Sequence, residues 1–449
     1  MSTGQDTKRF AGRSERAEEL RRRAHRAIPA GAHTYSKGDD QFPELAPAMI
    51  AEGSGCHVRD VDGNEFLDWG MGLRTTILGH AYPRVAEAVV AEVRRGVNHT
   101  RPSPVELEVA EQLIDLIPCA EMVKFAKNGS DVTTAAVRLA RAATGRSRVA
   151  FPNQHPFFSV DDWFIGSTAV DAGVPQEVKD LSVKFDYGDL ASLERLFDEH
   201  PDDIACVITE TATDGPPPAG FLEGVRELTR RHGALLVFDE MITGFRWDVR
   251  GSQHVYGVTP DMSTFGKAIA NGFSVSALTG RRDVMELGGL EHDKPRVFLL
   301  STTHGGETHA LAAARETIAE CRDRDVAGHL HRIGERLIDG LNGAARGLGL
   351  EDVVAARGYG ASPVIGWHGD PSEAAGLRTL FLQEMLARGV LIPYVAPSLS
   401  HGDAEVDRTV EAAAESLAAV REVLDGRPLA DLLTGPAARP VFRKFNYEG

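Results

Sequence analysis

At 449 residues the chain can bury a large hydrophobic core and form two or three domains, since single cores rarely grow beyond about 250 to 300 residues. Its 42% hydrophobic and 25% charged content is that of a globular protein and excludes disorder of the whole chain. The formal net charge of −16 argues against a nucleic-acid partner, because contact with phosphates requires a basic surface.

Cysteine spacing and the N-terminus indicate a reducing compartment. The four cysteines lie far apart, with neither CxxC nor zinc-ligand spacing, so we expect free thiols and no metal site. The first residues lack the apolar stretch of a signal peptide, and no run approaches the roughly 20 apolar residues that span a bilayer. We therefore expect a cytoplasmic protein without membrane contact.

The N-terminal part, residues 1–79, reads as a segment with a small lobe. Residues 14–27 are predicted to form a helix, and residues 28–43 form a loop that contains glycine and proline. Two short alternating runs within residues 55–69 flank Asp62 and Gly63, which is typical of a tight hairpin.

Helices and short apolar strands alternate over residues 80–325, the predicted large domain. The expected helices cover residues 83–97, 104–117 and 131–145, and the expected strands cover 122–127, 148–153, 204–210, 234–240 and 261–267. Apolar strands that alternate with helices predict an α/β domain with a mostly parallel sheet.

The C-terminal part, residues 326–449, is predicted to be a small α+β domain. A helix is expected over residues 329–349 and another over 404–424. Strands are expected near residues 362–369 and 389–395.

Polar residues follow the predicted strands, where ligands bind in parallel sheets. These residues are Asn128, Asn153, Glu210, Asp239 and Lys267. Lys267 is the only lysine between Lys184 and Lys294. Arginine would serve for a surface charge, whereas lysine is needed where an amine must lose a proton and attack a carbonyl carbon.

Each remaining piece of this pattern has an ordinary structural explanation when taken alone. An acidic pair such as Asp239 and Glu240 after a strand is commonly a helix cap or turn, and Asn128 to Ser130 would suit a helix N-terminus. Together, an anion-binding helix start, a buried carboxylate and a lysine on the next strand match the needs of pyridoxal 5′-phosphate (PLP).

At these motifs the sequence resembles the class III aminotransferases, particularly the subgroup around glutamate-1-semialdehyde 2,1-aminomutase. The similarity runs from Ile28 to Leu424 and includes "KNGSDVTT", "LLVFDEMITGFR", "YGVTPDMSTFGKAIANG" and "TTHGGETHALAAA". It implies the PLP-dependent transferase fold type I, with a large domain around a mostly parallel sheet and a small α+β domain. It also implies a homodimer with shared active sites.

The resemblance implies roles for individual residues. Lys267 would hold the cofactor aldehyde as a Schiff base and shuttle protons, and Asp239 would pair with the pyridine nitrogen. The other cofactor contacts would be Asn128, Gly129 and Ser130 at the phosphate, Thr303 at the partner's phosphate, Glu210 on the hydroxyl side of the ring and Met241 against its face.

Several positions depart from the family pattern. His155 falls where an aromatic ring usually stacks on the cofactor, and imidazole offers less area for stacking. Lys37 and Leu73 fall where the aminomutase has an arginine that grips a carboxylate and a tryptophan. Arg74 is a candidate replacement for that carboxylate contact, and a surface or interface ion pair is an equal alternative for it.

Extra carboxylates gather in segments expected near the pocket: Asp39, Asp40, Asp161, Asp162 and Glu307, the last where the family usually has asparagine. They would suit a polycationic substrate, or they cap helices and line a wet interface. We therefore predict an aminotransferase that uses an amino donor and an aldehyde or ketone acceptor, with an oxidised amino sugar or aminoglycoside of antibiotic biosynthesis as a candidate. The alternatives are glutamate-1-semialdehyde 2,1-aminomutase and a catalytically silent scaffold.

Overall fold

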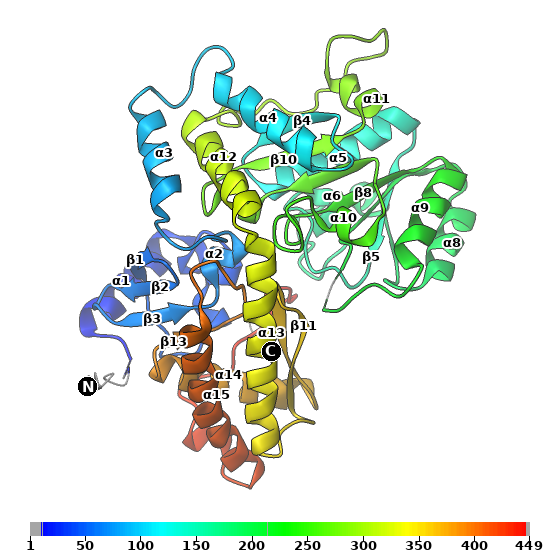
Figure 1. The fold of residues 1–449 in the computed structure, drawn as a ribbon. Helices are drawn as coiled ribbons and strands as arrows, with labels where there is room; N and C mark the ends of the chain where they lie inside the picture. The colour runs from blue at the N-terminus through cyan, green and yellow to red at the C-terminus, as the bar shows by residue number, and fades with distance from the viewer. Residues whose placement is uncertain (1–9, 11, 213, 446–449) are drawn as a thin grey trace. The chain divides into compact units, whose positions relative to one another are not determined.

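The computed structural model describes residue 10, residues 12–212 and residues 214–445, which belong to two compact units (Figure 1). Of the described residues, the large unit comprises those within Arg74–Ile77 and Pro83–Gly328 together with Lys444 and Phe445. The small unit comprises the described residues before Arg74 together with Leu78–Tyr82 and His329–Arg443.

A seven-stranded sheet with the order β4-β10-β9-β8-β7-β5-β6 forms the centre of the large unit. Its strands are β4 (Met122–Ala126), β5 (Arg148–Pro152), β6 (Ser182–Phe185), β7 (Ile204–Thr209), β8 (Leu235–Asp239), β9 (Met262–Phe265) and β10 (Ser276–Gly280). In this order, the neighbouring strands β9, β8, β7, β5 and β6 pair in parallel, and β10 pairs antiparallel with both β9 and β4. The predicted α/β fold with a mostly parallel sheet is confirmed.

Helices cover this sheet, and every residue of β7 is buried, as expected for a strand covered on both faces. The helical elements are α3 (Pro83–Val93), α4 (Pro104–Leu116), α5 (Gly129–Thr144), α6 (Asp162–Ile165), α7 (Gln176–Lys179), α8 (Leu190–Glu199), α9 (Phe221–His232), α10 (Ser252–Tyr256), η4 (Lys267–Ala270), α11 (Arg282–Met285), η5 (Glu286–Gly288) and α12 (Thr308–Asp323). Helix α5 packs along β7 to β10, and α12 packs on α3 and α4. Figure 1 shows α8 beside α9, where Phe197, Phe221 and Phe238 share one core.

The small unit combines a four-stranded sheet, a two-stranded sheet and long helices. Its strands are β1 (Ile50–Ser54), β2 (His57–Asp60), β3 (Glu65–Asp68), β11 (Val354–Tyr359), β12 (Ser362–Trp367) and β13 (Val390–Leu391). Its helical elements are α1 (Glu15–Ala27), η1 (Pro29–Gly31), η2 (Tyr35–Lys37), η3 (Asp39–Gln41), α2 (Met71–Arg74), α13 (Val326–Gly347), α14 (Pro371–Ala387), α15 (Asp403–Leu424) and η6 (Leu429–Asp431), of which α2 and α13 run into the large unit. The hairpin predicted around Asp62 is confirmed as β2 and β3.

Strand β13 joins the two ends of the chain in the small unit. It pairs in parallel with β3, so the N-terminal lobe and the C-terminal segment share one sheet. The Trp69 indole also donates a 2.8 Å hydrogen bond to the Thr409 hydroxyl of α15. From sequence alone residues 1–79 read as a separate lobe, because a pairing between residues over 300 positions apart leaves no local pattern. The boundaries at 79 and 325 stay predictions.

Within the described residues, every helix is too short or too polar to cross a membrane, and no group of His, Cys, Asp or Glu is placed to hold a metal ion. All four cysteines are buried free thiols.

Candidate cofactor and substrate site

Three ionisable side chains follow neighbouring strands at one edge of the large sheet. Asp239 ends β8, Glu210 directly follows β7, and Lys267 follows β9 after Gly266. Because β7, β8 and β9 are adjacent and parallel, their carboxyl ends meet at the same edge, where ligands bind in α/β proteins. The predicted convergence of these three residues is thus present in the fold.

Lys267 occupies an environment that favours the neutral amine. Burial lowers the pKa of Lys267, and the positive charges of Arg74 and Arg246 lower it further, although the carboxylates of Asp239 and Glu210 oppose this shift. Its backbone is left-handed with φ 43°, a conformation that costs free energy for a residue with a side chain. A strained lysine with a lowered pKa suits a nucleophile that attacks a carbonyl carbon.

Asp239 is held in one orientation with part of its hydrogen-bonding capacity unused. The Met241 N–H and the Thr264 hydroxyl donate to Oδ1 at 2.9 and 3.1 Å. Within the described residues Oδ2 accepts no hydrogen bond. Burial raises the pKa of Asp239 to about 6, although the charge of Lys267 acts in the opposite direction. A cationic group that met Oδ2 would stabilise the ionised carboxylate.

Glu210 remains protonated at neutral pH. Burial raises the pKa of Glu210 to about 8, the charge of Asp239 raises it further, and Lys267 and Arg74 oppose the rise. A carboxyl group that keeps its proton can donate a hydrogen bond to an oxygen of a ligand. This arrangement is compatible with the predicted place of Glu210 on the hydroxyl side of the cofactor ring.

His155 is a buried neutral imidazole beside Glu210. The Glu210 N–H donates to His155 Nδ1 at 3.2 Å, so the ring proton lies on Nε2. Burial lowers the pKa of His155 to about 3, and its ring packs against Tyr187 with centroids 5.2 Å apart. Nε2 is buried and has no hydrogen-bond partner in the described part of the chain. Stacking of this ring on the cofactor stays a prediction.

Side chains at and just before the start of β10 hold the backbone where the predicted phosphate loop, residues 128–130, begins. The Ser274 and Ser276 hydroxyls donate to the carbonyls of Lys127 and Asn128 at 2.9 and 2.8 Å. The Asp131 carboxylate accepts from the Asn128 N–H at 2.9 Å. The amides of the following two residues therefore lie at the N-terminus of α5, where a helix binds anions.

Two glycines leave room for Met241 between this helix start and Lys267. A Cβ atom on Gly129 would lie 3.0 Å from Met241 Sδ, and one on Gly266 would lie 2.6 Å from the same atom. Ser130 is buried, and its hydroxyl accepts from the Val160 N–H at 3.0 Å. The structure therefore places Gly129, Ser130 and Met241 together, whereas their contacts with the cofactor stay predictions.

Arg74 lies near the predicted catalytic residues, as its effects on the pKa values of Lys267 and Glu210 require. It ends a run of left-handed residues, Met71 to Arg74, with φ between 41° and 69°. The fully buried Arg246 fixes this turn, because its Nη2 donates to the Arg74 carbonyl at 2.9 Å. From sequence alone the role of Arg246, which follows the aspartate motif, is as ambiguous as that of Arg74.

Two further predicted residues are exposed. Thr303 is exposed in the segment before α12, and its carbonyl accepts from the Asn98 side-chain amide at 3.0 Å. Lys37 is exposed at the end of η2 in the small unit. Their roles in contacting phosphate and substrate stay predictions.

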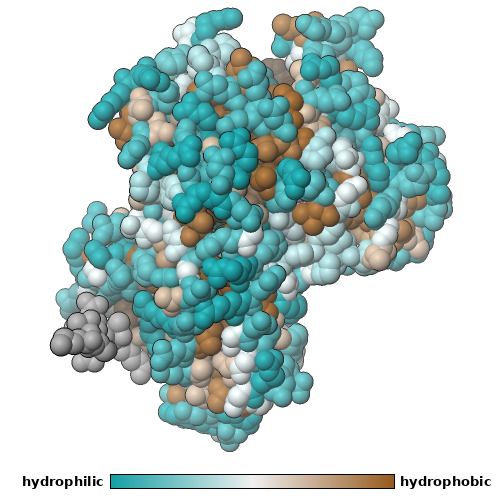
Figure 2. All heavy atoms as spheres, viewed as in Figure 1, coloured by the Kyte–Doolittle hydropathy of each residue, from teal (hydrophilic) through white to brown (hydrophobic). Residues whose placement is uncertain are grey.

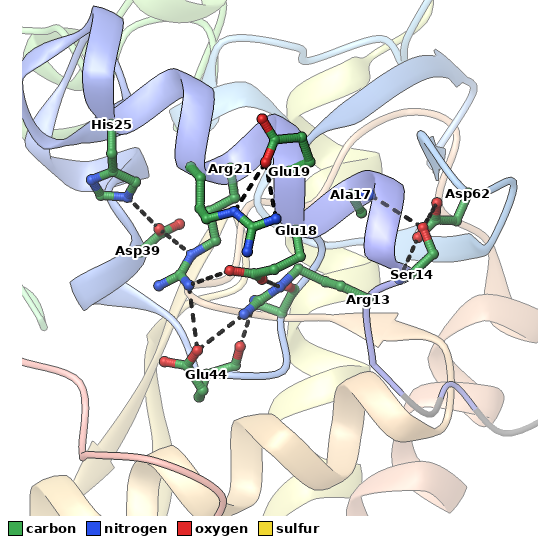
Figure 3. A network of polar contacts seen from close by, with 12 residues as sticks. Arg13, Ser14, Ala17, Glu18, Glu19, Arg21, His25, Asp39, Glu44 and Asp62 are labelled. Atoms are coloured by element: carbon green, nitrogen blue, oxygen red, sulfur yellow. Dashed lines mark hydrogen bonds and ion pairs between the residues drawn. The ribbon is translucent and has the colours of Figure 1, made fainter.

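Internal partners occupy most of the carboxylates expected to attract a polycation. Figure 3 shows Asp39 between Arg21 and His25, with both contacts at 2.6 Å. The corresponding partners are Arg443 for Asp40, Thr134 for Asp161 and Lys127 for Glu307. The structural alternative, that these residues cap and tie segments together, therefore explains four of the five positions.

Glu240, next to Asp239, is a structural residue. Its carboxylate accepts from the Ser252 N–H at 2.9 Å, the Ser252 hydroxyl at 2.7 Å and the Gln253 N–H at 3.0 Å, at the start of α10. We expect Glu240→Ala to lower the free energy of unfolding by about 3 kcal/mol, because buried donors lose their acceptor. Chemical unfolding measures this change. Glu227→Ala, at an exposed helix position, is the control, and equal stability of the two variants would contradict the assignment.

A phosphorylated pyridine ring fits the residues of this cluster. The amides at the start of α5 suit the phosphate, Oδ2 of Asp239 suits a protonated ring nitrogen, and Lys267 suits an aldehyde. The unsatisfied Nε2–H of His155 is a further donor that a ligand oxygen can use.

Comparison with known proteins supports the same cofactor. The aminotransferase class-III family model matches residues 37–415. Glutamate-1-semialdehyde 2,1-aminomutase of Methanothermobacter thermautotrophicus is 34% identical over 431 residues, which cover 90% of this chain and 100% of that protein.

Solved structures with the same fold include PLP-bound proteins. The Sphingopyxis sp. MTA144 FumI protein, whose structure holds PLP, has a TM-score of 0.85 and 26% identity, covering 94% of this chain and 100% of that one. An omega-transaminase from Sphaerobacter thermophilus has a TM-score of 0.81 and 28% identity, covering 90% and 97%.

Proposed function

Because the chain belongs to the class-III aminotransferase family and is a PLP-dependent enzyme, we propose that it transfers an amino group from an amino donor to an aldehyde or ketone acceptor. The observation that carries this proposal is the meeting of Lys267, Asp239 and Glu210 at one edge of the sheet. Lys267 is the nucleophile and proton carrier in this proposal, and the two acids control the charge around it.

PLP supplies a ring that withdraws electrons from the carbon bonded to the transferred nitrogen. Lys267 would hold the cofactor aldehyde through Nζ and would carry the proton that leaves the substrate α-carbon. Its lowered pKa favours the neutral amine, which is the form that can accept a proton. Asp239 Oδ2 would accept a hydrogen bond from the protonated ring nitrogen, while the Met241 N–H and the Thr264 hydroxyl donate to Oδ1.

The remaining cofactor contacts follow from the same arrangement. Gly129 and Ser130 offer backbone amides to the phosphate, and Asn128 begins their helix. Glu210 would donate its proton on the hydroxyl side of the ring, and the neutral His155 ring would pack against the face of the cofactor.

The aminomutase is the second candidate, because relatives 30% to 34% identical over most of the chain carry that name. It would use the same lysine and carboxylate but return nitrogen to the same carbon skeleton. Lys37 and Leu73 count against it, since they replace the carboxylate-binding arginine and the pocket tryptophan. Arg74, close to Lys267, is our proposed contact for a substrate carboxylate.

An oxidised amino sugar or aminoglycoside is the narrower proposal for the acceptor. Its support is weaker after the fold is considered, because Asp39, Asp40, Asp161 and Glu307 already have internal partners. Asp162, exposed at the start of α6, is the one of these carboxylates that remains for it. We therefore define the acceptor first as an aldehyde or ketone. A positive charge on the acceptor is only the secondary part of the proposal.

A homodimer is the proposed assembly. Large apolar side chains are exposed on the large unit, among them Leu290 at 81% and Phe298 at 75%, in the segment that leads to Thr303. Figure 2 shows brown apolar patches among polar residues on the face in view. A partner subunit that covers them would bring Thr303 toward a second site, as the resemblance implies.

The test uses the purified PLP-loaded enzyme and a panel of amino donors in the absence of an acceptor. We expect at least one donor to convert the cofactor to pyridoxamine phosphate and to release its oxo product, both detected by mass spectrometry. An added oxo-sugar or oxo-acid should then regain the nitrogen. Isomerisation of glutamate 1-semialdehyde, with no conversion by any donor, would instead establish the aminomutase.

A further inference from the structure

A partly buried ion pair connects the predicted phosphate loop with the segment before α12. Lys127 directly follows β4, and Glu307 directly precedes α12. Lys127 Nζ lies 2.7 Å from Glu307 Oε2, and the two side chains are 15% and 17% exposed. The same Nζ donates to the Ser274 carbonyl at 3.1 Å, so the ammonium group is fixed by two elements.

Glu307 is fixed through its other oxygen as well. Its Oε1 lies 2.7 Å from His304 Nδ1, within the segment 301–307 that also holds Thr303. Burial acts to raise the pKa of Glu307, but contacts with Lys127 and His304 hold it below the ordinary value. The carboxylate is therefore ionised, and its two oxygens contact Lys127 and His304.

The phosphate loop depends on side chains for its orientation. The Ser274 hydroxyl holds the Lys127 carbonyl, and the Asp131 carboxylate accepts from the N–H groups of Lys127 and Asn128. Lys127, which directly precedes the loop, thus combines two kinds of contact among the described residues. Its backbone is held by Ser274 and Asp131, and its side chain forms the ion pair with Glu307. Movement of its side chain would be transmitted to the amides that follow.

We propose that the Lys127–Glu307 ion pair positions the phosphate loop and couples it to segment 301–307. This inference rests on the proposed role of residues 128–130 in holding the cofactor phosphate. Glu307 stands where the resembled family usually has asparagine, which carries no charge to pair with Lys127. Glu307 neutralises the Lys127 ammonium group, so the oriented amides of the loop would bind the phosphate. Both residues would therefore act on the cofactor through the backbone of the loop.

The test compares PLP with pyridoxal, which lacks the phosphate, on apoenzyme of the full chain. We expect E307Q to raise the Kd of PLP about tenfold, because an uncompensated charge displaces the loop, and to change the Kd of pyridoxal less than about twofold. The charge-swapped K127E/E307K variant should recover most of the loss. D171N, which breaks a 2.6 Å pair with Lys179, is the matched control and should leave both constants unchanged.

Hydrogen exchange gives a second measurement that does not depend on activity. In E307Q, peptides that cover residues 301–307 and 127–131 should both exchange faster than in the wild type. Unchanged or tighter PLP binding by E307Q, equal losses for PLP and pyridoxal, or no recovery in the swapped variant would each overturn the inference. Failure of the wild-type apoenzyme to bind PLP would instead overturn the proposed function.

Discussion

Replacing Lys267 with alanine should reduce amino transfer by at least about 10³-fold while the protein stays folded. The substitution removes both the covalent link to the cofactor aldehyde and the base that moves the substrate proton. The side chain is not required by the core, because its burial already disfavours the charged amine and truncation removes that polar group. Single-turnover conversion of an amino donor, followed by mass spectrometry, measures the loss.

Two further variants separate the chemistry of Lys267 from its charge. Lys267→Arg keeps a cation but cannot lose a proton at neutral pH, so it should be as inactive as the alanine variant. Lys294→Ala removes an exposed lysine and should retain full activity. Normal turnover by Lys267→Arg, or a pyridoxyl mass on another lysine after borohydride reduction, would exclude the assigned role.

The alternating pattern of the large unit was enough to predict a mostly parallel sheet and five of its seven strands, but not β6 or β10. Strands such as β7 are apolar throughout because helices cover both faces, and each is followed by a polar segment at the ligand-binding edge. Strand β13 could not be predicted to join the N-terminal sheet, because its two residues pair with β3 from far along the chain. Local sequence records whether a segment is buried but not which distant strand it pairs with.

The candidate site was predictable where function requires a residue type at a strand end. Lys267 and Asp239 meet that condition, and their strands are adjacent in the fold. The strand pattern alone does not separate Asp239, which ends β8, from Glu240, which follows it; only the family resemblance singles out Asp239. The difference arises from α10. The N–H groups at its start donate to the Glu240 carboxylate, whereas Asp239 accepts from the Met241 N–H.

Long-range partners account for the predictions that lost support. Asp39 lies close to Lys37 in sequence, but Arg21 and His25 of α1 bind its carboxylate. Glu307 likewise pairs with Lys127, 180 positions earlier in the numbering. A run of acidic residues therefore predicts an acidic pocket only when no basic side chain from another segment reaches it, which requires the fold.

Replacing Asp239 with asparagine should separate stability from activity. In Asp239→Asn the side-chain amide oxygen can still accept from the Met241 N–H and the Thr264 hydroxyl, so the local geometry is retained. An amide cannot stabilise a protonated ring nitrogen, so we expect turnover to fall by about 10²-fold or more. In the apoprotein the same change removes a buried charge and should raise the free energy of unfolding by about 2 kcal/mol at pH 8.

The pH dependence follows from the sign of the shift. Burial raises the pKa of Asp239 to about 6 in the folded state, above its ordinary value of 3.8, so folding takes up a proton between these values. The wild-type apoprotein therefore loses stability relative to Asp239→Asn as the pH rises from about 4 to 6, and the difference is absent below that window. Asp261→Asn should instead destabilise the protein, because Asp261 is buried beside Arg226 and Arg281. Thermal unfolding of the three apoproteins, from this window up to pH 8, tests the sign of the effect. If the Asp239→Asn apoprotein is less stable than the wild type at pH 8, the ionised carboxylate stabilises the fold and is not kept for the cofactor.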